Sequence, residues 1–244
     1  MVMLAGLVRT TAAAEIKVLT TGAMKEVVLS VIPDFEKRTE HKVTVDNATA
    51  GALSRRIREG EAFDIAVITP AAIDEMIRIG KMAAGSRVDL ARVGVGVAVK
   101  QGAPLPDIST VDAFKRTLIG ARAVAHGDPA AGGSSGIYVA AMLARIGVAD
   151  AIRSKTILVP GGLVAERVVT GQAEIGLHQI SEILAVKGVT LVGPLPAEIQ
   201  NYTTYAVGLS LAAKDVGAAK AFIAALAAPN VEAVLKRRGM ERAP

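Results

Sequence analysis

Short apolar runs alternate with segments of helical periodicity along almost the whole of this 244-residue chain. The apolar run at 16–19 is followed by apolar residues from Met24 to Phe35 that recur about every 3.6 positions. Such alternation favours parallel sheets covered by helices, and the sequence therefore predicts an α/β fold. The predicted strands are 16–20, 42–46, 64–69, 94–99, 123–126, 156–159, 175–178, 190–192 and 205–212, and the predicted helices are 24–38, 50–59, 71–80, 111–118, 136–146, 163–170, 215–227 and a last one ending near 238.

Two connections divide this pattern. The glycine-containing run 94–99 leads into a turn at 102–104, and the polar segment 200–205 leads into the run 206–210. A chain that leaves one lobe at the first connection and returns at the second forms two lobes. Each would hold a mainly parallel sheet flanked by helices, and two hinge strands would join them. We expect lobe 1 to comprise 15–97 and 204–244, and lobe 2 to comprise 98–203.

In such a fold a ligand binds between the lobes, at the carboxyl ends of the strands. Tyr202 and Tyr205 would pack at the hinge, with one of them reaching the ligand.

Composition excludes several classes of protein. Aromatic residues make up 3% of the chain and the net charge is +5, which does not fit a nucleic-acid reader with stacking platforms and a dense basic patch. The absence of cysteine excludes disulfides, thiolate metal sites and cysteine nucleophiles. The three histidines are far apart in the sequence, so we expect no zinc site and no cofactor.

Residues 1–14 have features of a secretory signal whose start is truncated or misassigned. Residues 1–8 are apolar, and the alanines at 12–14 form a small-residue cleavage pattern, although Arg9 interrupts the apolar stretch. The alternative is a frayed tail. A signal predicts a periplasmic protein.

Small-residue breaks between strand and helix patterns indicate where a ligand binds. Backbone N–H groups are free at the start of a helix, and the helix dipole attracts anions to them. The polar residue Gln179, which follows a buried apolar run, and the glycine pair 161–162 offer further donors to the same cleft. The candidate ligand-binding residues are Thr21, Gly22, Ala23, Thr49, Ala50, Ser134, Ser135, Gly161, Gly162 and Gln179.

The order of several motifs resembles the periplasmic molybdate-binding proteins of ABC importers. The motifs are Lys17–Val18–Leu19, the segment 51–57 (Gly-Ala-Leu-Ser-Arg-Arg-Ile), the segment 61–67 (Glu-Ala-Phe-Asp-Ile-Ala-Val), Gly127–Asp128–Pro129 and the segment 171–176 (Gly-Gln-Ala-Glu-Ile-Gly). The resemblance implies a type II periplasmic binding protein fold that closes about a hinge on a small anion such as molybdate or tungstate. It also implies a monomer that works with the transmembrane permease subunits of an ABC importer.

The site departs from that family's pattern. The family places serines where this chain has Ala23 and Ala50, and a tyrosine at about Gln179, or at His178 if the register shifts by one. Backbone donors survive these changes and hydroxyl donors do not. Either Thr21, Thr49, Ser134 and Ser135 replace the lost donors, or the pocket fits a small organic carboxylate.

The leading functional expectation is a binding protein that is not an enzyme. The chain contains no phosphate-binding loop with its lysine and no Ser-x-x-Lys nucleophile pattern. The other class considered is a cleft enzyme on the same fold. A transcription-factor effector domain shares the fold, but too few residues precede Ile16 for a helix-turn-helix.

Overall fold

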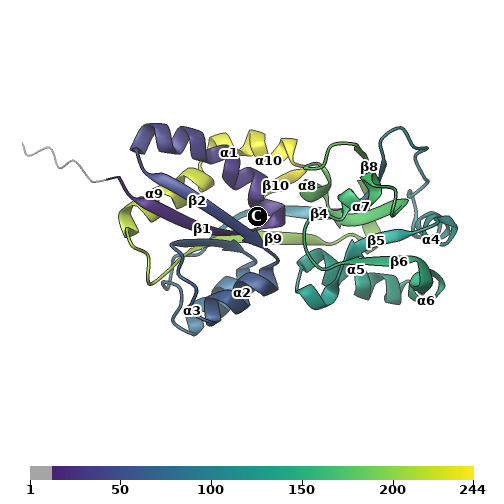
Figure 1. The fold of residues 1–244 in the computed structure, drawn as a ribbon, viewed down its shortest axis with the longest axis horizontal. Helices are drawn as coiled ribbons and strands as arrows, with labels where there is room; N and C mark the ends of the chain where they lie inside the picture. Colours follow the sequence, from purple (N-terminus) through teal and green to yellow (C-terminus); the bar gives the residue numbers. More distant parts are fainter. Residues whose placement is uncertain (1–12) are drawn as a thin grey trace, which may run out of the picture.

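The structure, a computed structural model, describes residues 13–244 (Figure 1). The predicted signal remnant at 1–14 lies outside this range except for its last two alanines. The strands are β1 (Glu15–Thr21), β2 (Lys42–Ala48), β3 (Ile65–Ile68), β4 (Val88–Lys100), β5 (Val124–Gly127), β6 (Thr156–Val159), β7 (Ile175–Gln179), β8 (Val189–Pro194), β9 (Tyr202–Leu209) and β10 (Met240–Arg242). The α-helices are α1 (Gly22–Thr39), α2 (Ala50–Arg58), α3 (Pro70–Arg78), α4 (Val111–Gly120), α5 (Ser134–Arg145), α6 (Ala149–Ile152), α7 (Ala165–Val169), α8 (Ile180–Ile183), α9 (Val216–Ala227) and α10 (Glu232–Arg237). Short 3-10 turns lie at Pro129–Ala131, Arg153–Lys155, Ala197–Ile199 and Pro229–Val231.

The strands form two sheets that share β4. In the first sheet β1 lies between β2 and β3 and is parallel to both, whereas β9 pairs antiparallel with β3 and β4. In the second sheet β5 lies between β6 and β7 and is parallel to both. β4 pairs with β9 up to Gly94 and with β7 from Val95 onward, so this one strand crosses between the sheets. Figure 1 shows β4 and β9 running along the long axis between the two bodies.

The central strands are almost continuously apolar, so both faces of each sheet must be covered, and helices cover them. One face of the first sheet packs against α1, α9 and α10, where Phe35 meets Phe222 edge-on at 4.8 Å between ring centroids. The opposite face packs against α2 and α3. On the second sheet α4, α5 and α6 cover one face and α7 covers the other.

The predicted α/β architecture is confirmed, while the lobe boundaries at 97/98 and 203/204 stay predictions. Three short elements were not predicted from the sequence, namely α6, α8 and β10. A four-residue helix shows little periodicity, and a three-residue strand depends on its partner β4. β4 also begins six residues before the predicted strand, because the exposed Asp89 and the half-buried Arg92 interrupt the apolar pattern of its first half, which pairs with β9.

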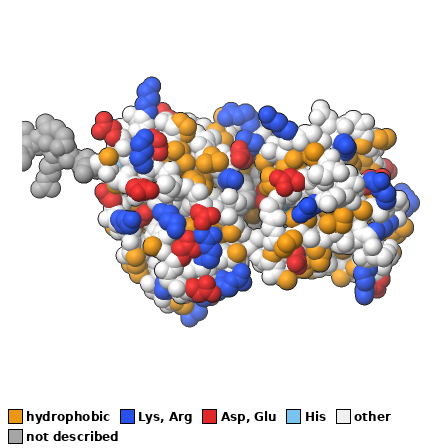
Figure 2. Space-filling model, in the orientation of Figure 1, with side chains coloured by type: hydrophobic (Ala, Val, Ile, Leu, Met, Phe, Trp, Pro, Cys, Tyr) orange, Lys and Arg blue, Asp and Glu red, His pale blue; other side chains and the backbone are white. Residues whose placement is uncertain are grey.

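The surface face in Figure 2 carries basic and acidic side chains intermingled, with no broad area of one sign. Among residues 13–244 no single helix has the length and apolar character needed to cross a membrane. Two pairs of consecutive helices have that length and apolar character only when the two bent helices of each pair are counted as one segment.

Candidate functional site

A cleft of about 540 Å³ lies between the elements of the two sheets. The strand ends that meet here are those of β1, β2 and β5, whose following segments start helices. Because these strands are parallel within each sheet, their carboxyl ends face the same space. The cleft therefore lies where the sequence predicted a ligand.

Three long helices begin at the cleft wall: α1 at Gly22, α2 at Ala50 and α5 at Ser134. None of the three has an acidic residue in its first turn that would occupy the free N–H groups. Thr49 caps α2 through its hydroxyl, whereas the Thr21 hydroxyl is buried without a hydrogen-bond partner in the structure. The cleft thus presents backbone N–H donors and the positive ends of helix dipoles to an anion. Its charged side chains are of both signs, because the carboxylates of Glu26, Asp128 and Glu166 also line it.

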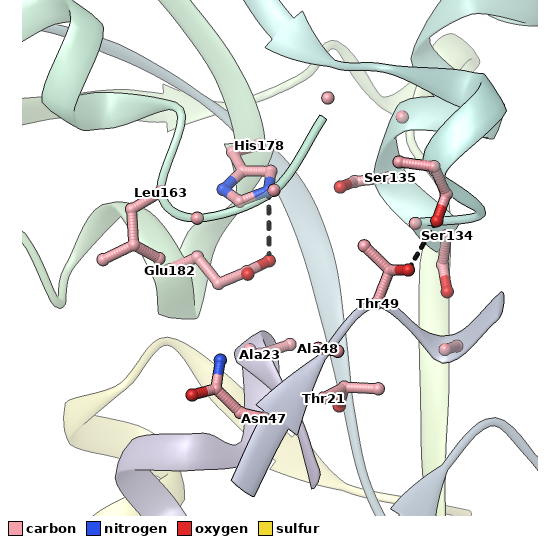
Figure 3. A pocket seen from close by; sticks show the side chains of 18 of the residues that line it. Thr21, Ala23, Asn47, Ala48, Thr49, Ser134, Ser135, Leu163, His178 and Glu182 are labelled. Carbon is pink, nitrogen blue, oxygen red and sulfur yellow. Dashed lines mark hydrogen bonds and ion pairs between the residues drawn. The ribbon is translucent and has the colours of Figure 1, made fainter. Parts of the chain in front are cut away.

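Nine of the ten predicted ligand-binding residues line this cleft. They come from the starts of α1, α2 and α5 and from the loop after β6. Figure 3 shows five of them, the labelled Thr21, Ala23, Thr49, Ser134 and Ser135. Their role in ligand binding stays a prediction. The nine are Thr21, Gly22, Ala23, Thr49, Ala50, Ser134, Ser135, Gly161 and Gly162.

Gln179 does not line the cleft, and its predicted placement is corrected. Its side chain is 1% exposed, and its Nε2 donates to Thr203 Oγ1 at 2.9 Å. Successive side chains of a strand point to opposite faces, so the end of β7 turns His178 to the cleft and Gln179 away from it.

His178 and Glu182 form a buried polar pair on the cleft wall. His178 ends the apolar part of β7, and Glu182 lies on α8, four residues later. The His178 Nε2 and the Glu182 Oε2 are 3.3 Å apart, and the side chains are only 8% and 12% exposed. Figure 3 shows the pair on the side of the cavity opposite Ser134 and Ser135.

Burial sets the protonation of this pair. It raises the pKa of Glu182 to about 8 and lowers the pKa of His178 to about 4, because the charged form of each group loses its water. Near neutral pH the pair therefore holds a protonated carboxyl beside a neutral imidazole. A carboxyl with a pKa close to the working pH is suited to take up and return a proton.

Gly22 makes room for the Glu182 carboxyl at the start of α1. A Cβ added to Gly22 would lie 2.4 Å from Glu182 Oε1, closer than a real Cβ approaches any atom. The Glu182 carboxyl, carried by α8 after β7 of the second sheet, thus reaches the start of α1, which packs on the first sheet. Glu182 was missed by the sequence analysis, and the spacing of His178 and Glu182 directly after an apolar strand was the available signal.

Direct contacts between the two bodies close one edge of the cleft. The Gly51 N–H donates to the Gly132 carbonyl at 3.0 Å, and the Thr49 hydroxyl donates to the Ala131 carbonyl. A Cβ at Gly51 would lie 2.9 Å from Gly132 Cα, so this approach of two backbones requires glycine. The remaining cationic side chains at the cleft are Lys25 and Arg55. In residues 13–244 no group of three His, Asp or Glu side chains is arranged to hold a metal ion.

The sequence of this protein matches the model of a family described as bacterial extracellular solute-binding protein over residues 16–241. The chain belongs to the bacterial extracellular solute-binding protein family. It is 33% identical over 233 residues to an aconitate isomerase from a Pseudomonas species, covering 93% of this chain and 87% of that protein. It is 27% identical over 236 residues to the molybdate-binding protein ModA of Azotobacter vinelandii, covering 93% and 90% of the two chains.

The periplasmic molybdate-binding protein of Azotobacter vinelandii also has a similar solved structure. The TM-score is 0.76 at 18% identity, and the match covers 92% of this solute-binding protein and 98% of that chain. The predicted resemblance to molybdate-binding proteins and the type II periplasmic binding protein fold are therefore confirmed.

One functional expectation is wrong. The sequence analysis described a protein that is not an enzyme, yet a relative that matches nearly the whole chain at 33% identity is named as an isomerase. The absent motifs on which that expectation rested are those of nucleophilic and phosphoryl-transfer enzymes. A buried histidine–glutamate pair brought together by a four-residue helix belongs to neither class.

Proposed function

We propose that this solute-binding protein is an isomerase of a small unsaturated polycarboxylate such as aconitate. The observation that carries the proposal is the His178–Glu182 pair, buried in the wall of a cleft whose other walls are helix N-termini. The similarity to an aconitate isomerase over 93% of the chain supports it. Acidic substrate groups and an acid–base pair would then meet in one enclosed space.

The helix starts supply the binding. A polycarboxylate presents several oxygens that only accept hydrogen bonds, and the starts of α1 and α5 present free N–H donors, whereas the Gly51 and Ala52 N–H groups of α2 already have partners. Lys25 and Arg55 also line the cleft and add positive charge, which the carboxylates of the lining partly offset. Anchoring of the carboxylates at two or three points would fix the carbon chain against the His178–Glu182 wall.

The pair supplies the chemistry. Aconitate has a methylene group flanked by a carboxylate and a carbon–carbon double bond. The ionised form of Glu182 removes a proton from this methylene, and the C–H electron pair spreads over the allylic carbons and the carboxylate. Return of a proton at the far carbon re-forms the C–H bond with the double bond shifted. His178 holds the Glu182 carboxyl in place, and the reaction needs neither oxidant nor cofactor.

A molybdate-like oxyanion fits this cleft less well. Ala23 and Ala50 offer no hydroxyls, so the side-chain donors that a compact oxyanion needs on every side are missing at two places in the lining. An unpaired buried oxygen costs about 1–3 kcal/mol, so a small oxyanion left with several of them would bind weakly. The organic carboxylate is the better supported of the two anions.

Delivery of a captured anion to ABC permease subunits, periplasmic location and a monomeric state stay predictions. Membership in a family of extracellular solute-binding proteins supports the first two. Capture and isomerisation would use the same cleft.

The proposal is tested by incubating the purified protein with trans-aconitate and with cis-aconitate separately and following both isomers by proton NMR. We expect both reactions to reach the same ratio of isomers. Glu182→Gln should lower kcat by at least about 100-fold, since general acid–base catalysis contributes about 10²–10⁴-fold. Glu198→Gln, an exposed glutamate in the turn Ala197–Ile199, is the matched control and should retain full activity. Binding of aconitate without conversion by the wild type would refute the proposal.

A further inference from the structure

The two tyrosines of β9 have different environments. Tyr202 is 52% exposed, and the Arg92 guanidinium lies 5.1 Å from its ring centroid. Tyr205 is 3% exposed, its ring packs in the core of the first sheet, and it also lines the cleft. Tyr205 is therefore the hinge tyrosine that reaches the ligand space.

A buried amide holds the Tyr205 phenol from behind. Gln179 Nε2 donates to Tyr205 Oη at 3.4 Å and to Thr203 Oγ1 at 2.9 Å. Thr203 and Tyr205 are two residues apart on β9, so they point to the same face of the strand. Gln179 belongs to β7 of the second sheet, and this small network joins the two bodies where β4 crosses between them.

The direction of these hydrogen bonds leaves the phenol proton free. A tyrosine hydroxyl has one proton to donate, and here its oxygen accepts from the Gln179 amide. Burial and the nearby Glu182 charge raise the pKa of Tyr205, while the hydrogen bonds to Ser134 and Gln179 lower it by less. The phenol thus keeps its proton and can donate it toward the cleft.

The same hydroxyl lies beside the start of α5. Ser134 is the first residue of α5 and lines the cleft together with Tyr205, and its side chain is close enough to the phenol to lower the pKa of Tyr205. The free N–H groups of α5, the Ser134 hydroxyl and the Tyr205 hydroxyl therefore converge on one place in the cleft wall. That place faces the His178–Glu182 pair across the cavity.

We propose that Tyr205 is a catalytic residue that donates a hydrogen bond to the substrate carboxylate held at the start of α5, and that Gln179 is the positioning residue that aims it. This inference rests on the proposed function. When Glu182 removes the proton from carbon, negative charge moves onto the adjacent carboxylate. A donor fixed beside that carboxylate stabilises the charge more in the transition state than in the bound substrate.

The test measures kcat and KM for trans-aconitate in four variants. Tyr205→Phe removes only the hydroxyl and should lower kcat about 10- to 100-fold with a change in KM below about threefold. Gln179→Met should lower kcat by a smaller factor. The double variant should be no slower than Tyr205→Phe alone, because Gln179 acts through the hydroxyl. Tyr202→Phe, the exposed tyrosine on the same strand, should match the wild type.

Equal kcat and KM values for Tyr205→Phe and the wild type would overturn the inference, as would additive losses in the double variant. If the wild type binds propane-1,2,3-tricarboxylate but converts no aconitate, the proposed function fails by itself. The contact at Tyr205 is then tested by calorimetry with that tricarboxylate, where Tyr205→Phe should weaken binding at least fivefold. An unchanged Kd, or no binding by the wild type, would also reject the contact.

Discussion

Replacement of Gly22 with alanine tests how closely the cleft holds the Glu182 carboxyl. The new Cβ would lie 2.4 Å from Glu182 Oε1, and real Cβ atoms essentially never come within 3.0 Å of another atom. The carboxyl must therefore move by at least about 0.6 Å. It can do so by rotating its own side chain, so the fold is expected to persist.

The expected loss of activity follows from that displacement. A misplacement of about 1 Å in a reacting group can cost about 100-fold in rate. We predict a fall in kcat for aconitate of about that size in Gly22→Ala, although no titratable group has been removed. The free energy of unfolding should not fall, because alanine favours a helix over glycine by about 0.5–1 kcal/mol.

The assay combines NMR turnover with urea unfolding of the same samples. Gly120→Ala is the matched control, since a Cβ at Gly120 meets no atom within 4 Å. Full activity in a folded Gly22→Ala variant would refute the view that Glu182 acts from the start of α1. A loss equal in both variants would also refute it.

Three further predictions concern the cleft edge, the buried pair and the fold. Gly51→Ala places a Cβ 2.9 Å from Gly132 Cα, and a backbone atom at that distance cannot move aside easily. We therefore expect propane-1,2,3-tricarboxylate to bind about tenfold more weakly in calorimetry and the radius of gyration to be larger in X-ray scattering. Unchanged values would show that this contact does not govern closure of the cleft. Between pH 4.5 and 6.5 the raised pKa of Glu182 and the lowered pKa of His178 have opposite effects on stability, whereas from 6.5 to about 8 only Glu182 keeps a proton that the unfolded chain has lost. The free energy of unfolding should therefore fall with rising pH in that upper range, by at most about 1.4 kcal/mol per unit, and urea titrations of Glu182→Gln should lack this slope; the same slope in both proteins would contradict the assignment. Asp64 is 3% exposed, and its carboxylate accepts hydrogen bonds from the backbone N–H groups of Lys17 and Lys214, both at 2.8 Å. Asp64→Ala should therefore lower the free energy of unfolding by about 3 kcal/mol in urea titrations. A loss below about 1 kcal/mol would show that the two donors find other partners.

The helix starts at the cleft were predictable because each follows a strict local rule. A strand that ends in small residues before a helical pattern leaves free N–H groups at the helix start. Thr21, Thr49 and Ser134 satisfy that rule and lie at the cleft. The α/β alternation was equally visible, since strands buried on both faces and amphipathic helices have different periods.

The acid–base pair was not predicted, for two physical reasons. The first is the end of β7, where a difference of one residue exchanges His178 for Gln179 at the cleft, and the pairing of β7 with β4 and β5 fixes that register. The second is α8, which is too short to show periodicity and packs through Ile180 against Gly96 and Gly239. These tertiary contacts bring Glu182 to His178 and Gly22.

The conversion of trans-aconitate by the purified wild-type protein, followed by proton NMR, tests the central claim most directly. We predict that cis-aconitate appears until the equilibrium ratio is reached, and that Glu182→Gln converts at least about 100-fold more slowly while still binding the acid. A wild-type protein that binds the acid and leaves it unchanged, or a Glu182→Gln variant as fast as the wild type, would contradict the assignment of catalysis to the His178–Glu182 pair.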